Sequence, residues 1–212
     1  PSAAHVGLYL GLKASQADIQ VPACNYWVFP DEYNHELSQK RYADINSDLP
    51  VTYISFPSAK DPHWREQHPD RSMVEVIIIV PYEWFSKWEE TTWKKRGEDY
   101  EALKQQLAEQ MLEVLYRVEP QLKDKIDYME ISTPLSTKKF TDHQHGEIYG
   151  VSHTPKRFRQ EFLKPHTPVK NFYLTGQDAM IGSIAGGLIG GVLCASTILK
   201  KDVLGKIKRV IK

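Results

Sequence analysis

The residues best suited to chemistry lie between 171 and 199, in the segment NFYLTGQDAMIGSIAGGLIGGVLCASTIL. The short apolar run Phe172–Leu174 predicts a buried strand. A polar turn containing Gly176 and Asp178 follows, and residues 179–199, which carry no charge, predict a helix. The N-terminus of such a helix offers unpaired N–H groups and partial positive charge, which suit a phosphate or an electron-rich ring edge.

The predicted helix carries glycines at four-residue spacing, so part of its surface is bare backbone. Gly182, Gly186 and Gly190 share one face, and Gly187 and Gly191 form a second pair. A glycine face allows close packing against a strand, another helix or a flat ligand. Strand, glycine turn and glycine-faced helix together favour contact with a nucleotide cofactor.

Two other interpretations of the uncharged run remain open. Its length is that of a transmembrane helix, small residues four apart suit helix packing in membranes, and Lys200 and Lys201 follow at once. Against a membrane anchor, five glycines make the run weakly hydrophobic. A plain buried core helix is the third interpretation.

A second glycine-bearing segment, DHQHGEIYG, ends at Gly150. Gly146 and Gly150 bracket it and permit tight turns and close backbone approach to a ring, although an ordinary turn has the same pattern. His143 and His145 are two residues apart, which matches no standard zinc spacing, so we expect a polar loop and no metal site. Two further histidines lie in proline-bearing loop sequence and are expected to be solvated: His153 and His166.

Aromatic residues cluster between 82 and 93, where Trp84 and Trp88 share one face at helical spacing, as do Phe85 and Trp88. Such a stripe usually packs in a core, but it is also the lining that a long apolar ligand needs. The C-terminal KKDVLGKIKRVIK has six basic residues against Asp202, with an apolar face at three- to four-residue spacing. This pattern is typical of a helix that lies on an anionic membrane, or of a terminal helix that packs one face on its own domain.

Composition excludes several classes of protein. The 212 residues contain 27 basic and 27 acidic side chains, so no electrostatic argument favours nucleic acid. Two distant cysteines, Cys24 and Cys194, fit neither a disulfide framework nor a zinc site. No G-x-G-x-x-G fingerprint occurs. The chain begins at Pro1 without a methionine, from which we expect it to be an interior part of a longer protein.

Hydrophobic periodicity predicts five strands before the glycine-rich region, of which Met73–Val80 is the strongest and is expected to be central in a sheet. A long amphipathic helix is expected over Glu98–Val118. Strands, helices and long loops alternate irregularly, so the fold class is α+β. Composition changes near Lys170, where we expect residues 1–170 to end and residues 171–212 to begin a second region. The other four strands are expected at 6–12, 25–29, 51–56 and 125–131.

Several blocks resemble one family of enzymes. YLTGQD before a glycine-rich apolar helix is similar to the C-terminal signature of the FAD-dependent polyene oxidoreductases, namely phytoene desaturases, carotenoid isomerases and retinol saturases. The blocks closest to the retinol saturase branch occur in order along the chain: FPSAKDP at 56–62, Trp64, YEWF at 82–85, RGEDY at 96–100, GEIYG at 146–150 and the C-terminal stretch. The resemblance covers only the C-terminal half of such an enzyme.

The resemblance implies a fold and a function. Residues 1–170 would form a substrate-binding region on a mixed or antiparallel sheet. Residues 171–212 would return, by a strand and the glycine-rich helix, to an FAD-binding Rossmann domain that this chain lacks. The implied activity is oxidoreduction at a CH–CH bond of a retinoid or carotenoid, most like saturation of a retinol double bond by hydride from reduced flavin, with NAD(P) as a possible electron donor. This fragment alone would be inactive.

The resemblance also implies site residues. Asp178 would accept a hydrogen bond from a ribityl hydroxyl or orient a water toward the phosphates, and the glycines would let the helix approach the flavin. Many relatives have glycine where this chain has Ser183. The candidates for proton donation are Tyr149 and Glu147, and those for lining the polyene channel are Trp84, Phe85 and Trp88. The predicted cofactor contacts are Gly146, Gly150, Gly176, Gln177, Asp178, Gly182, Ile184 and Gly186.

Three hypotheses therefore compete. The chain is a piece of a flavoenzyme, whose partners are a hydrophobic polyene and its own N-terminal FAD-binding half. Alternatively it is a complete tail-anchored membrane protein, or a lipid- or retinoid-binding module without chemistry. In the first case we expect a cytoplasmic location, peripheral to a membrane through residues 200–212, and the endoplasmic reticulum membrane if the source is eukaryotic.

Overall fold

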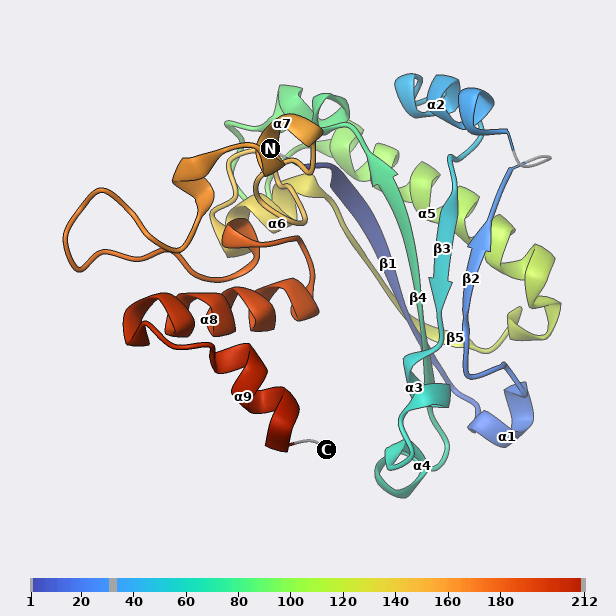
Figure 1. The fold of residues 1–212 in the computed structure, drawn as a ribbon. Coiled ribbons are helices and arrows are strands. Elements are labelled where there is room, and N and C mark those ends of the chain that lie inside the picture. The colour runs from blue at the N-terminus through green and yellow to red at the C-terminus, as the bar shows by residue number, and fades with distance from the viewer. Residues whose placement is uncertain (1, 31–33, 211–212) are drawn as a thin grey trace. The chain divides into compact units, whose positions relative to one another are not determined.

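The structure is a computed structural model that describes residues 2–30 and 34–210 (Figure 1). Its backbone contacts divide the chain into two compact units. The larger unit is Ala4–Gly146, and the smaller one joins Pro1–Ala3 to Glu147–Lys212. The division therefore falls at residue 146, earlier than the change of composition near Lys170. The reason is that residues 148–151 bond with Ser2, Ala3 and Asp178 of the smaller unit.

The larger unit is built on a five-stranded sheet in which every neighbouring pair is antiparallel, in the order β2-β3-β4-β1-β5. This confirms the α+β class, with an antiparallel sheet. β4 is the middle strand, as its β-branched sequence predicted. The strands are β1 (Ala4–Leu12), β2 (Asn25–Val28), β3 (Thr52–Ser55), β4 (Ser72–Val80) and β5 (Ile126–Ser132).

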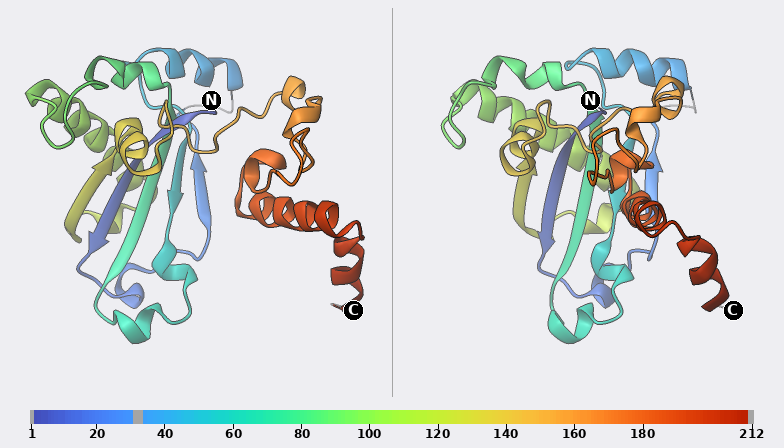
Figure 2. Two further views of the ribbon diagram at one scale, coloured as in Figure 1. Left: turned by 90° about the vertical axis from the view of Figure 1, so that its left-hand side faces the viewer. Right: turned by 60° about the vertical axis from the view of Figure 1, so that its left-hand side comes forward.

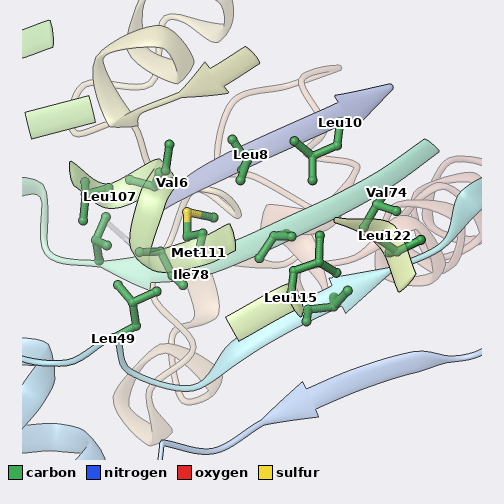
Figure 3. Close-up of a cluster of buried hydrophobic side chains, with 14 of the residues drawn as sticks. Val6, Leu8, Leu10, Leu49, Val74, Ile78, Leu107, Met111, Leu115 and Leu122 are labelled. Carbon is green, nitrogen blue, oxygen red and sulfur yellow. The ribbon is translucent and has the colours of Figure 1, made fainter. Parts of the chain in front are cut away.

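One face of the sheet forms the core against the long helix α5 (Glu98–Val118), whose bounds match the sequence prediction. Side chains alternate along β1 and β4, so every second residue points to this face. Met111 of α5 is fully buried there, together with Leu8 of β1 and Ile78 of β4 (Figure 3). The labelled core residues are Val6, Leu8, Leu10, Leu49, Val74, Ile78, Leu107, Met111, Leu115 and Leu122.

Among the described residues of this unit, no long helix covers the opposite face of the sheet (Figures 1 and 2). Across it, the register aligns Trp27 with Tyr53, Tyr53 with Ile77, and Ile77 with Gly7. Trp27 is 64% exposed and packs on Tyr53 with ring centroids 4.9 Å apart. Tyr53 and Ile77 are half-buried. This face therefore presents an apolar row, which we call the sheet row (Trp27, Tyr53, Ile77 and Gly7).

Shorter helices join the strands of the larger unit. The aromatic stretch after Pro81 forms the 3₁₀-helix η1, whose three-residue period places Tyr82, Phe85 and Trp88 on the buried side. α-Helical spacing had paired Trp84 with Trp88, but Trp84 is only half-buried. The remaining helices are α1 (Gln16–Ile19), α2 (His35–Ala43), α3 (Pro57–Lys60), α4 (Trp64–Gln67), η1 (Tyr82–Trp88), η2 (Pro120–Leu122) and α6 (Pro134–Thr141).

The smaller unit consists of helices and loops. The strand expected at Phe172–Leu174 is wrong: Phe172 is 56% exposed, and the segment forms only an isolated bridge between Tyr173 and His166. Its apolar residues resemble a strand in sequence, but within residues 2–30 and 34–210 no strand pairs with it. The helices are α7 (Pro155–Phe158), η3 (Glu161–Leu163), η4 (Gln177–Ala179), α8 (Ile184–Leu199) and α9 (Val203–Val210).

The smaller unit buries little apolar surface of its own. Cys194, at 8% exposure, is the one buried hydrophobic residue among its described residues, whereas the other buried hydrophobic residues all belong to Ala4–Gly146. Ile184 and Leu188 of α8 are 96% and 70% exposed. A unit of this kind is expected to be stabilised by apolar contact with another surface.

Candidate functional site

The smaller unit gathers the second glycine-bearing segment and the turn before α8 into one cluster. Asp178 Oδ1 accepts a hydrogen bond of 3.0 Å from the N–H of Val151. Gly150 has φ +69°, and a Cβ there would lie 2.8 Å from both carboxylate oxygens of Asp178. Glycine is therefore required at 150 both by its left-handed backbone and by the nearness of this carboxylate.

Arg157 holds the same turn from the other side. One of its terminal nitrogens, Nη2, donates to the carbonyl oxygens of Gln177 and Asp178 at 3.0 and 2.9 Å. Arg157 as a whole is 6% exposed, and its Nη1 donates to Val151 O at 3.4 Å. Because one planar group serves three carbonyls, Arg157 fixes the backbone of η4 relative to residue 151.

His153 binds the backbone of Gly182, two residues before the start of α8. Its Nε2 accepts the N–H of Gly182, and its ring lies edge-on to Tyr149 at 6.3 Å. Burial and the charge of Arg157 lower the pKa of His153, against a smaller opposite effect of Asp178. The imidazole is therefore neutral at neutral pH, as an acceptor must be. The prediction that His153 is solvated holds only in part: the residue is half-buried, because its ring packs near Tyr149 and Phe158 and its Nε2 accepts the Gly182 N–H.

The glycines of α8 separate into two groups. A Cβ on Gly186 would overlap the carbonyl oxygen of Ile181, and one on Gly190 would overlap that of Gly176. These two positions are used for close packing inside the unit. By contrast, a Cβ on Gly187 or Gly191 would meet nothing within 4 Å. Their bare backbone faces open space.

Gly182 was predicted on the face of the helix, but α8 begins only at Ile184. Ser183 is the N-cap, and its Oγ accepts the N–H of Gly186 at 2.9 Å. The helix starts here because the Ser183 hydroxyl satisfies one of its first free N–H groups. Gly182 lies before the cap, where a Cβ would come within 2.8 Å of Tyr149 Cβ.

The structure brings most, but not all, of the predicted site residues together. Glu147 is buried, and Gly146 belongs to the larger unit, where its φ of +56° and the Pro134 carbonyl account for the glycine. The residues that share the cluster are Tyr149, Gly150, Gly176, Gln177, Asp178, Gly182, Ile184 and Gly186.

The aromatic candidates belong to the larger unit. Phe85 is fully buried in its core. Trp84 and Trp88 border a shallow cavity of about 580 Å³ together with Leu103, and charged residues such as Lys87 form part of its lining. Nothing in their position beyond this cavity identifies them as a ligand site.

The sequence raised the questions of a metal site and of a transmembrane helix. Within residues 2–30 and 34–210, no group of three or more His, Cys, Asp or Glu side chains is arranged to hold a metal ion. In the same described residues, no single helix has the length and apolar composition needed to cross a membrane. α8 and α9 meet that criterion only as a pair, with a bend of 118° between them.

Arg157 was not among the residues predicted for the site, and His153 was predicted to be solvated. The signal that was available is Thr154-Pro155, an N-cap followed by proline at the first helical position, which predicts the short helix α7. It indicates that Arg157 is helical, but not that its side chain reaches η4, twenty residues further on.

No family model matches the chain. Curated relatives do. The chain is 33% identical over 93% of its length to the all-trans-retinol 13,14-reductase of Danio rerio, and 31% identical over 99% to that of Homo sapiens. The chain belongs to the retinol saturase family.

Two further findings qualify this membership. The chain spans about a third of the length of the curated relatives it matches, 34% and 36% for these two, which is less than the half expected from the resemblance. Another relative of the retinol saturase family in Danio rerio, 29% identical over 92% of the chain, is named an inactive all-trans-retinol 13,14-reductase. Membership of the family therefore does not by itself establish activity.

Proposed function

We propose that the protein carrying this chain is a flavin-dependent oxidoreductase that saturates one C=C bond of a conjugated polyene, with a retinoid as substrate. The observation that carries the proposal is the open glycine surface of α8 next to its capped N-terminus. It is supported by the activity for which the relatives are named, retinol 13,14-reduction.

The residues of the cluster fit a flavin dinucleotide. Because Ser183 takes only the N–H of Gly186, the amides of Ile184 and Ala185 must be satisfied from outside the helix. They suit an electron-rich ring edge. Gly176 and Gly187 have open space where a side chain would lie, so a flat group can approach the backbone. Asp178 is exposed, and its second carboxylate oxygen is suited to a ribityl hydroxyl.

Gly186 has a different role in this proposal from the one expected from sequence. It is occupied by packing against Ile181 O and holds α8 in place. In this proposal Gly187, in place of Gly186, lets the flavin approach the backbone of α8 closely. Arg157 and His153 act one step away from the cofactor, by positioning η4 and Gly182.

Reduced FAD, when bound, would supply hydride to one carbon of the double bond and become oxidised, and the proposed donor that reduces it again is NAD(P)H. The other carbon must gain a proton. On the smaller unit, Tyr149 is the candidate, because it is 44% exposed and borders Gly182 at the start of α8. Glu147 is buried, so its role is to support this segment.

The sheet row is the surface that we assign to the polyene. A long conjugated chain needs an extended apolar wall, and Trp27, Tyr53 and Ile77 supply one across three strands. His5 lies on the same face, opposite Ile79. Its Nδ1 is buried and finds no hydrogen-bond partner among the described residues, and burial lowers its pKa. A neutral imidazole here suits the single hydroxyl of retinol.

The exposed apolar residues of α8 also suit the rest of the protein. We assign Ile184 and Leu188 to contact with the FAD-binding Rossmann domain that the family resemblance implies. This contact would place the open glycines against the cofactor.

The first test is spectroscopic. The full-length protein should copurify with flavin, visible by its absorbance, and should bleach the conjugated band of retinol when supplied with reductant. Gly187→Leu should abolish flavin binding, because the added side chain fills the open surface. Gln105→Leu, which adds the same side chain at an exposed site on α5, should leave it unchanged.

The relative named inactive favours one alternative, retinoid binding without turnover. Retention of retinol without bleaching, in a protein that holds flavin, would select this alternative. Flavin binding that survives Gly187→Leu would overturn the assignment of α8.

A further inference from the structure

The C-terminal helix α9 has two chemically distinct sides. Val203, Leu204, Ile207 and Val210 fall within about a third of the helix circumference. Lys206, Lys208 and Arg209 occupy the rest. Ile211, the fifth apolar residue of the sequence pattern, lies outside the described residues.

The apolar side of α9 is only partly covered. Ile207 is 38% and Val210 86% exposed. The helix is attached to α8 at its first residue, where Val203 N–H donates to Ser196 Oγ at 3.3 Å. Beyond this attachment α9 projects from the end of α8 (Figure 2). At its far end, Val210 is therefore not covered by any described element of the smaller unit.

The corner between α8 and α9 enlarges the same kind of surface. Ile198 and Leu199, in the last turn of α8, are 51% and 57% exposed, and the exposed Lys200 and Lys201 follow them. Asp202 is the one acidic residue between 198 and 210, and its carboxylate is used to accept the Gly205 N–H at 2.8 Å. Lysine and arginine thus dominate the charge of this corner.

We propose that α9 and the last turn of α8 form a docking surface for an anionic lipid membrane, with α9 lying in the plane of the interface. The positive charge of this surface favours an anionic membrane over a neutral groove of another protein as its partner. Five basic side chains surround four exposed apolar ones, so anionic headgroups satisfy the charges while Ile207 and Val210 enter the acyl boundary.

Such docking would bring the protein to the phase in which a retinoid is dissolved. The inference does not depend on the proposed reaction, since it concerns α9 alone. Its test therefore uses binding and not activity.

The test is flotation of the full-length protein with phosphatidylcholine vesicles, with or without phosphatidylserine. We expect binding only to vesicles with phosphatidylserine, weakened by salt. Lys208→Gln combined with Arg209→Gln should reduce partitioning about 30-fold. Ile207→Ser combined with Val210→Ser should reduce it to a similar degree, because the apolar side no longer enters the membrane.

The matched control is Lys123→Gln with Lys125→Gln, which removes the same charge from two exposed lysines of the larger unit. It should bind vesicles like the unmodified protein. Equal loss in the control, equal binding to both kinds of vesicle, or full binding by either α9 variant would overturn the proposal. Unchanged thermal unfolding of the variants verifies that they are folded.

Discussion

Tyr26 and Glu119 join the edge strand β2 to the end of α5. The phenol donates a hydrogen bond of 2.6 Å to Glu119 Oε1, and the Gln121 amide donates to Oε2 of the same carboxylate at 2.7 Å. The carboxylate is buried at 7% exposure. A short strand at the open edge of the sheet is thereby attached to the helix that covers the core.

Removing this hydrogen bond should destabilise the larger unit. We expect Tyr26→Phe to lower the free energy of unfolding by about 1–2 kcal/mol, because Glu119 loses a donor while buried. Chemical denaturation measures the change. Tyr128→Phe removes an exposed phenol that donates to Glu130 at 2.7 Å and should cost less than about 0.5 kcal/mol. Equal costs for the two variants would contradict the assignment.

The same pair predicts a pH dependence. Its hydrogen bond to Glu119 raises the pKa of Tyr26 to about 12. The folded state thus favours the protonated phenol, so its stabilisation is complete below the unfolded value near 10 and is lost as pH rises through about 12. Alkaline absorbance titration should show that Tyr26→Phe removes a late-titrating tyrosine. If Tyr26→Phe instead removes a tyrosine that titrates near pH 10, the hydrogen bond does not raise the pKa of Tyr26.

Protonation of His153 in acid should weaken its contact with the Gly182 amide. Its pKa is lowered, so the neutral ring stabilises the fold fully above the ordinary value of 6.5, and that stabilisation is lost as pH falls through the lower folded value. NMR titration of the imidazole and hydrogen exchange of the Gly182 amide should change together. His153→Gln, which keeps an acceptor, should protect Gly182 better than His153→Ala. Independent titration of the two signals would exclude the contact.

Gly187 and Gly190, three residues apart on α8, should change stability in opposite directions when each is replaced by alanine. Gly190→Ala should separate α8 from Gly176 and destabilise the smaller unit, because the methyl group overlaps the carbonyl. Gly187→Ala meets only open space and should stabilise α8 by roughly 0.5–1 kcal/mol in the flavin-free protein. Hydrogen exchange along α8 distinguishes them. Equal effects would mean that the glycines do not divide as described.

Arg157→Lys should loosen η4, although it keeps the charge, because an ammonium cannot reproduce the planar fork that reaches three carbonyls. Faster hydrogen exchange at residues 177–180 and about 10-fold weaker flavin binding are expected, as measured by flavin fluorescence on dilution. The exposed Arg159→Lys is the control and should change neither quantity. A normal η4 in the Arg157 variant would refute this positioning role.

Replacing Phe85 should lower the stability of the larger unit. Phe85→Ala is expected to cost about 3–5 kcal/mol of unfolding free energy, because the side chain is fully buried beside the sheet. Trp84→Ala, at a half-buried position, should cost less. A stable Phe85→Ala protein with altered retinoid affinity would instead support the sequence hypothesis that Phe85 lines the polyene channel.

Much of the larger unit was predictable because its signals are local. The bounds of α5 follow from apolar residues at three- to four-residue spacing and from Pro120, which ends the pattern. The central place of β4 follows from its β-branched run before Pro81. The 3₁₀ period of η1 was not predictable, because a three-residue and a 3.6-residue period differ too little over seven residues.

The candidate site divides differently. The family, the glycine positions and the turn that contains Asp178 are visible in local motifs of the sequence. Folding determines that Gly186 and Gly190 pack against backbone carbonyls while Gly187 stays open, and that Arg157 and His153 hold the backbone around residues 177–182. No local spacing encodes these contacts, because each joins atoms that only folding brings together, such as Gly190 and the Gly176 carbonyl.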